Sequence, residues 1–185
     1  NSKSLLRVSN LQQHAISEDI QNKVIQKLKS ILNNCDLLIF SDFNYGSLPQ
    51  SLVDRVVQLA KEKSILCVAD SQSSSQTGNI ARFSKMDLIL PTEREARISL
   101  RNNEDGLVVI SDKIMKESNS RYLILKLGPD GILVEDSLAR NSKTNNDWYT
   151  DRLPSLNVNP VDVAGAGDSL LVGSSLTLAA NGNIW

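Results

Sequence analysis

Residues 162–168 read Asp-Val-Ala-Gly-Ala-Gly-Asp and run directly into the apolar stretch Ser169–Ala180. Two glycines one residue apart allow a tight turn, whose bare N–H groups would lie at the start of a helix, where the macrodipole favours anions. Asp168 then stands where a carboxylate could take a proton from a hydroxyl that attacks a bound phosphate. The stretch therefore predicts a phosphate site whose anion-binding residues are Gly165, Ala166 and Gly167.

The same turn also has a purely structural interpretation. Asp is a preferred N-cap and glycine suits the turn between a strand and a helix, so an α/β protein can contain this sequence without binding phosphate. Two other phosphate signatures do not fit. Leu170 stands where the dinucleotide signature Gly-x-Gly-x-x-Gly has its third glycine, and the Gly-Lys-Ser/Thr ending of the P-loop is not present. Taken alone, the turn leaves both interpretations open.

The composition of the chain argues against several classes of function. Its 185 residues suit about one domain, and its 20 basic and 21 acidic residues nearly cancel without a long run of either sign. Nothing electrostatic therefore indicates nucleic acid or an anionic membrane as a partner. No stretch approaches the roughly 20 apolar residues that span a bilayer, and the first residues of the sequence do not show the charged-then-apolar pattern of a signal peptide. We expect a soluble cytoplasmic protein.

Few residues are available for a metal cluster or a nucleophilic triad. Cys35 and Cys67 lie next to predicted strands and are expected to be buried, reduced thiols, because no Cys-x-x-Cys spacing is present. His14 is the only histidine and is expected in an exposed loop. A histidine-based metal site or a Ser-His-Asp triad is therefore disfavoured.

Amphipathic helical patterns alternate with short aliphatic runs along the chain, which favours an α/β fold with a mostly parallel sheet and helices on both faces. Helices are predicted over 17–34, 49–63 and 92–100, within 105–118, and after Gly167. Strands are predicted at 37–40, 65–69, 87–90, 122–127, 132–135, 148–149 and 161–163, with a polar loop at 140–147. The turn Gly128-Pro129-Asp130-Gly131 predicts an antiparallel hairpin toward the C-terminal part.

Ligands of such sheets bind beyond the carboxyl ends of the strands. The segments expected at that edge are Ser41–Ser47, Asp70–Gly78, Thr92–Glu95, Gly128–Gly131 and Gly165–Asp168. All of them are rich in polar residues, so we expect the functional site there.

In this order, the segments resemble the PfkB, or ribokinase-like, carbohydrate kinase family over essentially the whole chain. The C-terminal signature of that family, Asp-Thr-x-Gly-Ala-Gly-Asp, matches residues 162–168 except that Val163 replaces threonine. Lys126-Leu127-Gly128 with Gly131 resembles the nucleotide-side loop Thr-Leu-Gly-x-x-Gly. Thr92-Glu93-Arg94-Glu95 resembles the Asn-x-x-Glu motif, which is associated with magnesium and phosphate.

The branch most similar to the chain is the heptose-phosphate kinase domain of bacterial ADP-heptose synthesis enzymes. Residues 41–46, Ser-Asp-Phe-Asn-Tyr-Gly, resemble its Ser-Asp-Tyr-x-Lys-Gly pattern, and residues 70–72, Asp-Ser-Gln, stand against its Asp-Pro-Lys. Tyr45 and Gln72 therefore replace two lysines, and two cationic contacts to an anionic acceptor are missing. Whether the acceptor already carries a phosphate stays open.

The resemblance implies ATP-dependent phosphorylation of a sugar or sugar-phosphate hydroxyl by a ribokinase-like domain over 1–185, with a homodimer as the expected assembly. The implied ATP-binding residues are Lys126, Gly128, Gly131 and Asp162, with a monovalent cation near Asp162. Glu95 is the implied Mg²⁺ residue, and Asp42, Asp70 and Asp168 are the implied acceptor-binding residues. The family is about half as long again, so we expect this chain to be an inactive fragment that lacks an N-terminal lid and the last helices.

Each implied role has a structural alternative. Thr92 and Glu95 also fit a capping box, and Asp162 fits a turn in which it bonds its own backbone. Lys126 could simply be solvated, and Asp42 and Asp70 could cap the loops that follow them.

Two other functions are also open. The changes at Tyr45, Gln72, Thr92 and Val163 suit a non-catalytic sugar- or nucleotide-binding module that has kept the fold. A nucleoside or vitamin kinase of the same fold would differ in the acceptor pocket.

Overall fold

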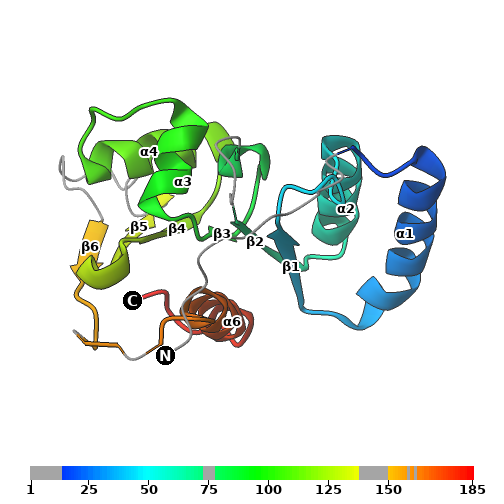
Figure 1. Ribbon diagram of the computed structural model, residues 1–185. Coiled ribbons are helices and arrows are strands. Elements are labelled where there is room, and N and C mark those ends of the chain that lie inside the picture. Colours follow the sequence, from blue (N-terminus) through cyan, green and yellow to red (C-terminus); the bar gives the residue numbers. More distant parts are fainter. Residues whose placement is uncertain (1–13, 73–77, 138–149, 158, 161) are drawn as a thin grey trace.

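The computed structural model describes residues 14–72, 78–137, 150–157, 159–160 and 162–185. Its centre is a six-stranded sheet in which the strands follow one another in chain order (Figure 1). The strands are β1 (Leu37–Asp42), β2 (Leu66–Ser71), β3 (Leu88–Ile89), β4 (Tyr122–Lys126), β5 (Ile132–Asp136) and β6 (Thr150–Leu153). Strands β1 to β4 pair in parallel, whereas β5 and β6 pair antiparallel. The predicted fold class and the predicted hairpin are confirmed.

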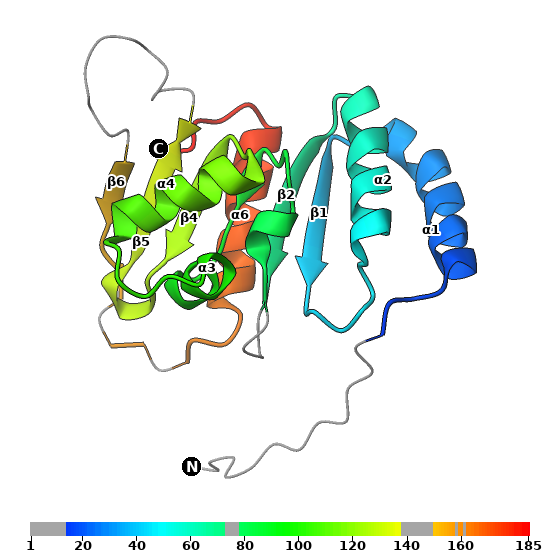
Figure 2. The same cartoon turned by 90° about the horizontal axis from the view of Figure 1, so that it is seen from above.

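Helices cover both faces of the sheet. They are α1 (Glu18–Ile31), α2 (Gln50–Glu62), α3 (Glu93–Leu100), α4 (Leu107–Ser118) and α6 (Ala166–Ala179). Figures 1 and 2 show α2, α3 and α4 on one face, with α1 beside α2, and, of the described helices, α6 on the other face. Each face has its own apolar cluster, which includes Phe83 on the first face and Leu171 of α6 on the second.

Apolar spacing decides which side of a helix meets the sheet. In α2, the buried residues recur at helical spacing and form one apolar stripe: Leu52, Val53, Val56, Val57 and Ala60. Full burial of a Val or Leu side chain contributes about 1.5–3 kcal/mol, so this stripe orients the helix. Pro49 is the N-cap of the helix rather than part of its first turn.

The strand predicted at 161–163 is wrong in the described part of the chain. Asp162 and Val163 are not extended ladder residues, because Asp162 Oδ1 accepts a hydrogen bond from the N–H of Ala164 at 2.8 Å and closes a turn. The helix also begins earlier than predicted, at Ala166, with Gly165 as N-cap. Residues 140–147 and the strand predicted at 148–149 lie outside the described residues, and β6 begins at Thr150.

The cysteine and histidine predictions hold in part. Cys67 is buried and unpaired as predicted, but Cys35 is only partly buried because it lies at the end of a 3₁₀ turn before β1. His14 is exposed as predicted. Among the described residues, no helix is long and apolar enough to cross a membrane.

The turn between β4 and β5 contains two glycines with left-handed backbones, Gly128 at φ +62° and Gly131 at φ +89°. A Cβ on Gly131 would lie 2.0 Å from the carbonyl oxygen of Leu153, whereas one on Gly128 would have no neighbour within 4 Å. We expect Gly131→Ala to lower the free energy of unfolding by about 2–3 kcal/mol and Gly128→Ala by about 1 kcal/mol. Urea unfolding of both variants measures the difference, and equal losses would contradict the close approach of β6 to this turn.

Candidate functional site

Two charged side chains from different strands meet at the carboxyl edge of the sheet. Lys126, the last residue of β4, donates a hydrogen bond from Nζ to Oδ1 of Asp70 at 2.8 Å. The Lys126 side chain is 15% exposed and that of Asp70 only 3%. Strand β3 lies between β2 and β4 and ends at Ile89, so the two side chains meet beyond its end.

The charges around Asp70 oppose one another. Burial raises the pKa of the Asp70 carboxyl, the neighbouring Lys126 ammonium lowers it, and the nearby Glu95 and Asp168 carboxylates raise it further. These groups comprise three carboxylates and one ammonium, so they carry a net negative charge when all are ionised. A phosphate-bearing ligand would need further positive charge here, which a divalent cation supplies.

The glycine turn at the start of α6 faces this ion pair. Gly165 has φ +76°, and a Cβ placed on Gly167 would lie 3.9 Å from Nζ of Lys126. Asp168 lies in the exposed first turn of α6 and is close enough to influence the pKa of Asp70. Residues that are far apart in the sequence, Asp70, Lys126 and the 165–168 turn, therefore share one site.

Thr92 and Glu95 form the capping box that was the structural alternative. Oγ1 of Thr92 accepts a hydrogen bond from the N–H of Glu95 at 3.2 Å, and Oε2 of Glu95 accepts one from the N–H of Thr92 at 2.7 Å. The box fixes the buried Glu95 carboxylate at the start of α3. Among the described residues, no group of three His, Cys, Asp or Glu side chains could hold a metal. Mg²⁺ often uses only one or two carboxylates together with substrate phosphates, so Glu95 suits that type of site.

Two cavities lie on either side of the turn that follows β4. One of about 570 Å³ is lined by residues of this turn, of the segment after β6 and of α6: Lys126, Gly128, Gly131, Ala166 and Gly167 among them. The other, of about 580 Å³, is lined by Thr92, Arg94 and Arg97 of the α3 region. Lys126 and Gly128 line both cavities. Both volumes lie in the usual range for small-molecule sites.

Asp42 belongs to a separate network at the end of β1. Its Oδ1 accepts a hydrogen bond from the N–H of Asn44 at 3.0 Å, and its Oδ2 forms an ion pair with the Arg82 guanidinium at 2.7 Å. Arg82 was not predicted as a site residue. It lies 40 residues from Asp42 in the sequence, and nothing in the surrounding residues signals the contact.

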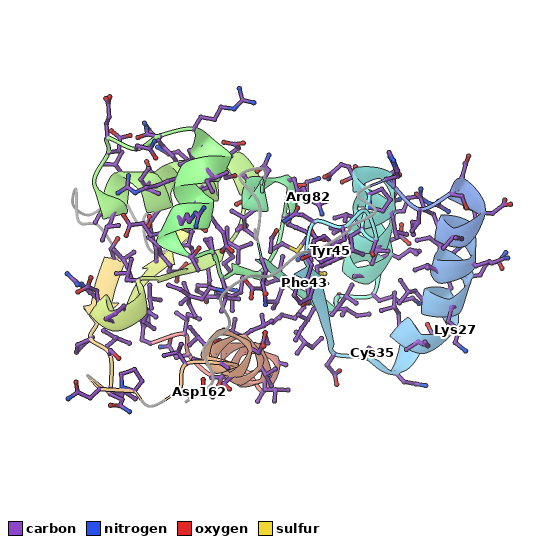
Figure 3. The ribbon with its side chains drawn as sticks, viewed as in Figure 1. Lys27, Cys35, Phe43, Tyr45, Arg82 and Asp162 are labelled. Atoms are coloured by element: carbon purple, nitrogen blue, oxygen red, sulfur yellow. The ribbon has the colours of Figure 1, made fainter. Side chains whose placement is uncertain are left out.

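The loop after β1 is fixed to the end of β2. The Nδ2 group of Asn44 donates to Oγ of Ser71 at 3.1 Å and to the carbonyl of Gln72 at 3.3 Å. On either side of Asn44, the rings of Phe43 and Tyr45 stack with their centroids 6.2 Å apart. Figure 3 shows these rings and Arg82 near the end of β1, whereas Asp162 lies apart, by the start of α6.

Comparison with known proteins identifies sequence relatives of the whole chain. A family model described as "pfkB family carbohydrate kinase" matches residues 8–184. The bifunctional protein HldE of Helicobacter hepaticus is 25% identical over 184 residues, which cover 98% of this chain and 35% of that protein. HldE of Campylobacter fetus is 24% identical over 87% of this chain and 32% of its own length. The chain thus spans about a third of the length of these relatives.

Solved structures share the fold at lower identity. The tetrameric inhibited form of phosphofructokinase-2 from Escherichia coli superposes with a TM-score of 0.69 at 18% identity, over 92% of this chain and 53% of that one. A ribokinase from Arabidopsis thaliana, solved with ribose and ATP, gives a TM-score of 0.64 at 16% identity, over 92% and 49%. The ribokinase-like fold is therefore confirmed, and this chain spans about half of each of those chains.

Proposed function

The chain belongs to the pfkB family of carbohydrate kinases, and on this premise we propose that it transfers the γ-phosphoryl group of ATP to a hydroxyl of a sugar or sugar phosphate. One observation carries the proposal. The N-terminal turn of α6 opens, at Ala166 and Gly167, into the cavity that Lys126, Gly128 and Gly131 also line. A phosphate bound there would meet helix-end N–H groups, a positive dipole end and an ammonium group together.

The nucleotide end of the site is proposed to work through positioning and charge. The N–H of Gly167 would bind the transferred phosphoryl group, since the N–H of Ala166 already donates to the carbonyl of Val163 at 3.2 Å. Lys126 would contact the same phosphates. Gly128 and Gly131 of the turn after β4 line the cavity and, having no side chains, leave room for the nucleotide. Glu95 would hold Mg²⁺, which neutralises phosphate charge, and the turn at Asp162 would lie near a monovalent cation.

Asp168 is the proposed general base. The acceptor hydroxyl would lose its proton to the Asp168 carboxylate while its oxygen forms a bond to the γ-phosphorus, and ADP would leave with the electrons of the broken P–O bond. Asp70 and Asp42 lie at neighbouring strand ends and would accept hydrogen bonds from other hydroxyls of the sugar. The absence of lysine at 45 and 72 leaves the phosphorylation state of the acceptor open.

ADP formation by the full-length protein tests the proposal. MgATP is incubated with a panel of neutral sugars, sugar phosphates and nucleosides, and ADP release is followed with and without each acceptor. We expect acceptor-dependent ADP formation with at least one sugar or sugar phosphate. ATP binding without transfer to any acceptor would favour the non-catalytic binding module, and transfer to nucleosides alone would favour a nucleoside kinase.

A further inference from the structure

The Lys126 ammonium lies between the Asp70 carboxylate and the glycine turn at the start of α6, where we propose that phosphate binds. The ammonium lies near Gly167, and the Lys126 side chain lines the cavities on both sides of the β4–β5 turn. Within the described ranges, the hydrogen bond from Nζ goes to Asp70. An ammonium group is a compact point charge with three N–H donors, so it can exchange one oxygen partner for another by a small movement of its flexible stem.

The ionised form of the Asp70 carboxyl depends strongly on the Lys126 ammonium for its stabilisation. The Asp70 side chain is 3% exposed, and the charges of Glu95 and Asp168 act on it with the same sign as its own. A terminal phosphate at the start of α6 would be a second anion close to the same ammonium. The empty site and the nucleotide-bound site therefore offer Lys126 different partners.

We propose that Asp70 competes with the nucleotide for Lys126. In the empty site the Asp70 carboxylate binds the Lys126 ammonium, and when ATP binds, the ammonium leaves Asp70 and pairs with a phosphate of ATP instead. The inference rests on the proposed kinase function and adds an interaction between its two substrates. Once Lys126 has moved to the phosphate, the buried Asp70 carboxylate lacks its ion-pair partner. A hydroxyl of the acceptor restores a hydrogen bond to it, so ATP and acceptor each promote binding of the other.

A double-mutant cycle on ATP affinity tests the competition. Titration calorimetry measures the Kd of MgATP for the full-length protein and for Asp70→Asn, Lys126→Met and the double variant, without acceptor. We expect Asp70→Asn to bind ATP about fivefold more tightly than the unmodified protein, at the lower end of usual couplings between sites. In the Lys126→Met background, the same Asp70→Asn change is expected to leave the Kd nearly unchanged.

The outcomes separate this inference from the proposed function. Equal tightening in both backgrounds would overturn the inference, because it would show a general loss of negative charge rather than competition for Lys126. Unchanged or weaker ATP binding in Asp70→Asn would overturn it as well, while ATP binding by the unmodified protein would keep the kinase proposal intact. No ATP binding by the unmodified protein would overturn both. Thermal unfolding checks each variant, and Lys126→Gln or Asp70→Ser replaces any variant that does not fold.

Discussion

Asp168→Asn is expected to lower the acceptor-dependent turnover of ATP by about 100- to 10,000-fold, the usual contribution of a general base. Asparagine has the shape of aspartate but cannot accept the proton of the attacking hydroxyl at neutral pH. The side chain lies in the exposed first turn of α6, so the substitution removes no buried contact. The proposed binding site for the nucleotide stays in place, because the groups of the turn that we propose to bind the phosphate are backbone N–H groups. The Kd of MgATP should therefore be largely preserved.

Initial rates and calorimetric Kd values, measured on the same preparations, test this expectation. A matched control is Asp19→Asn, which also removes a carboxylate from the first turn of a helix, but in α1. We expect the control to keep the turnover of the unmodified protein. Unchanged turnover in Asp168→Asn would refute the assignment of the base. Loss of ATP binding in parallel with turnover would instead assign Asp168 to the nucleotide.

The fold could be predicted because its signals are local. Alternation of amphipathic helices and aliphatic strands gave the α/β class, and the glycine-rich turn at 128–131 gave the hairpin between β4 and β5. The strand at 161–163 could not be predicted correctly, because short apolar runs do not reveal whether a partner strand exists. Here the Asp162 side chain bonds its own turn instead.

The candidate site was predictable only in part, for a different reason. Strand-end residues could be assigned to one edge of the sheet from topology alone, which brought Asp70, Gly128 and Asp168 into the same region, whereas Lys126 was named only from the family resemblance. Ion pairs across 40 residues, as for Asp42 and Arg82, and across 56 residues, as for Asp70 and Lys126, have no local signal. From the sequence, Lys126 could be either a phosphate-binding residue or a solvated side chain. The structure shows a third arrangement, in which the Lys126 side chain is largely buried and paired with the Asp70 carboxylate.

This buried pair should have a large effect on stability. Lys126→Met is expected to lower the free energy of unfolding at neutral pH by about 3 kcal/mol, because it leaves the Asp70 carboxylate 3% exposed without its cation. Adding Asp70→Asn should restore most of that loss, since neutral replacement of both partners of a buried ion pair is often nearly neutral. Urea unfolding of the two single variants and the double variant measures both changes.

The Lys61–Asp87 ion pair provides the matched control for this experiment. Its two atoms are 2.7 Å apart, much as in the Lys126–Asp70 pair, but the side chains are 39% and 28% exposed. Lys61→Met should therefore cost less than about 1 kcal/mol, as is usual for ion pairs in contact with water. Equal costs at the two lysines would show that burial of Asp70 does not make Lys126 important for stability. The cost of Lys126→Met should also shrink as the pH falls, because burial raises the Asp70 pKa and protonation removes the unpaired charge.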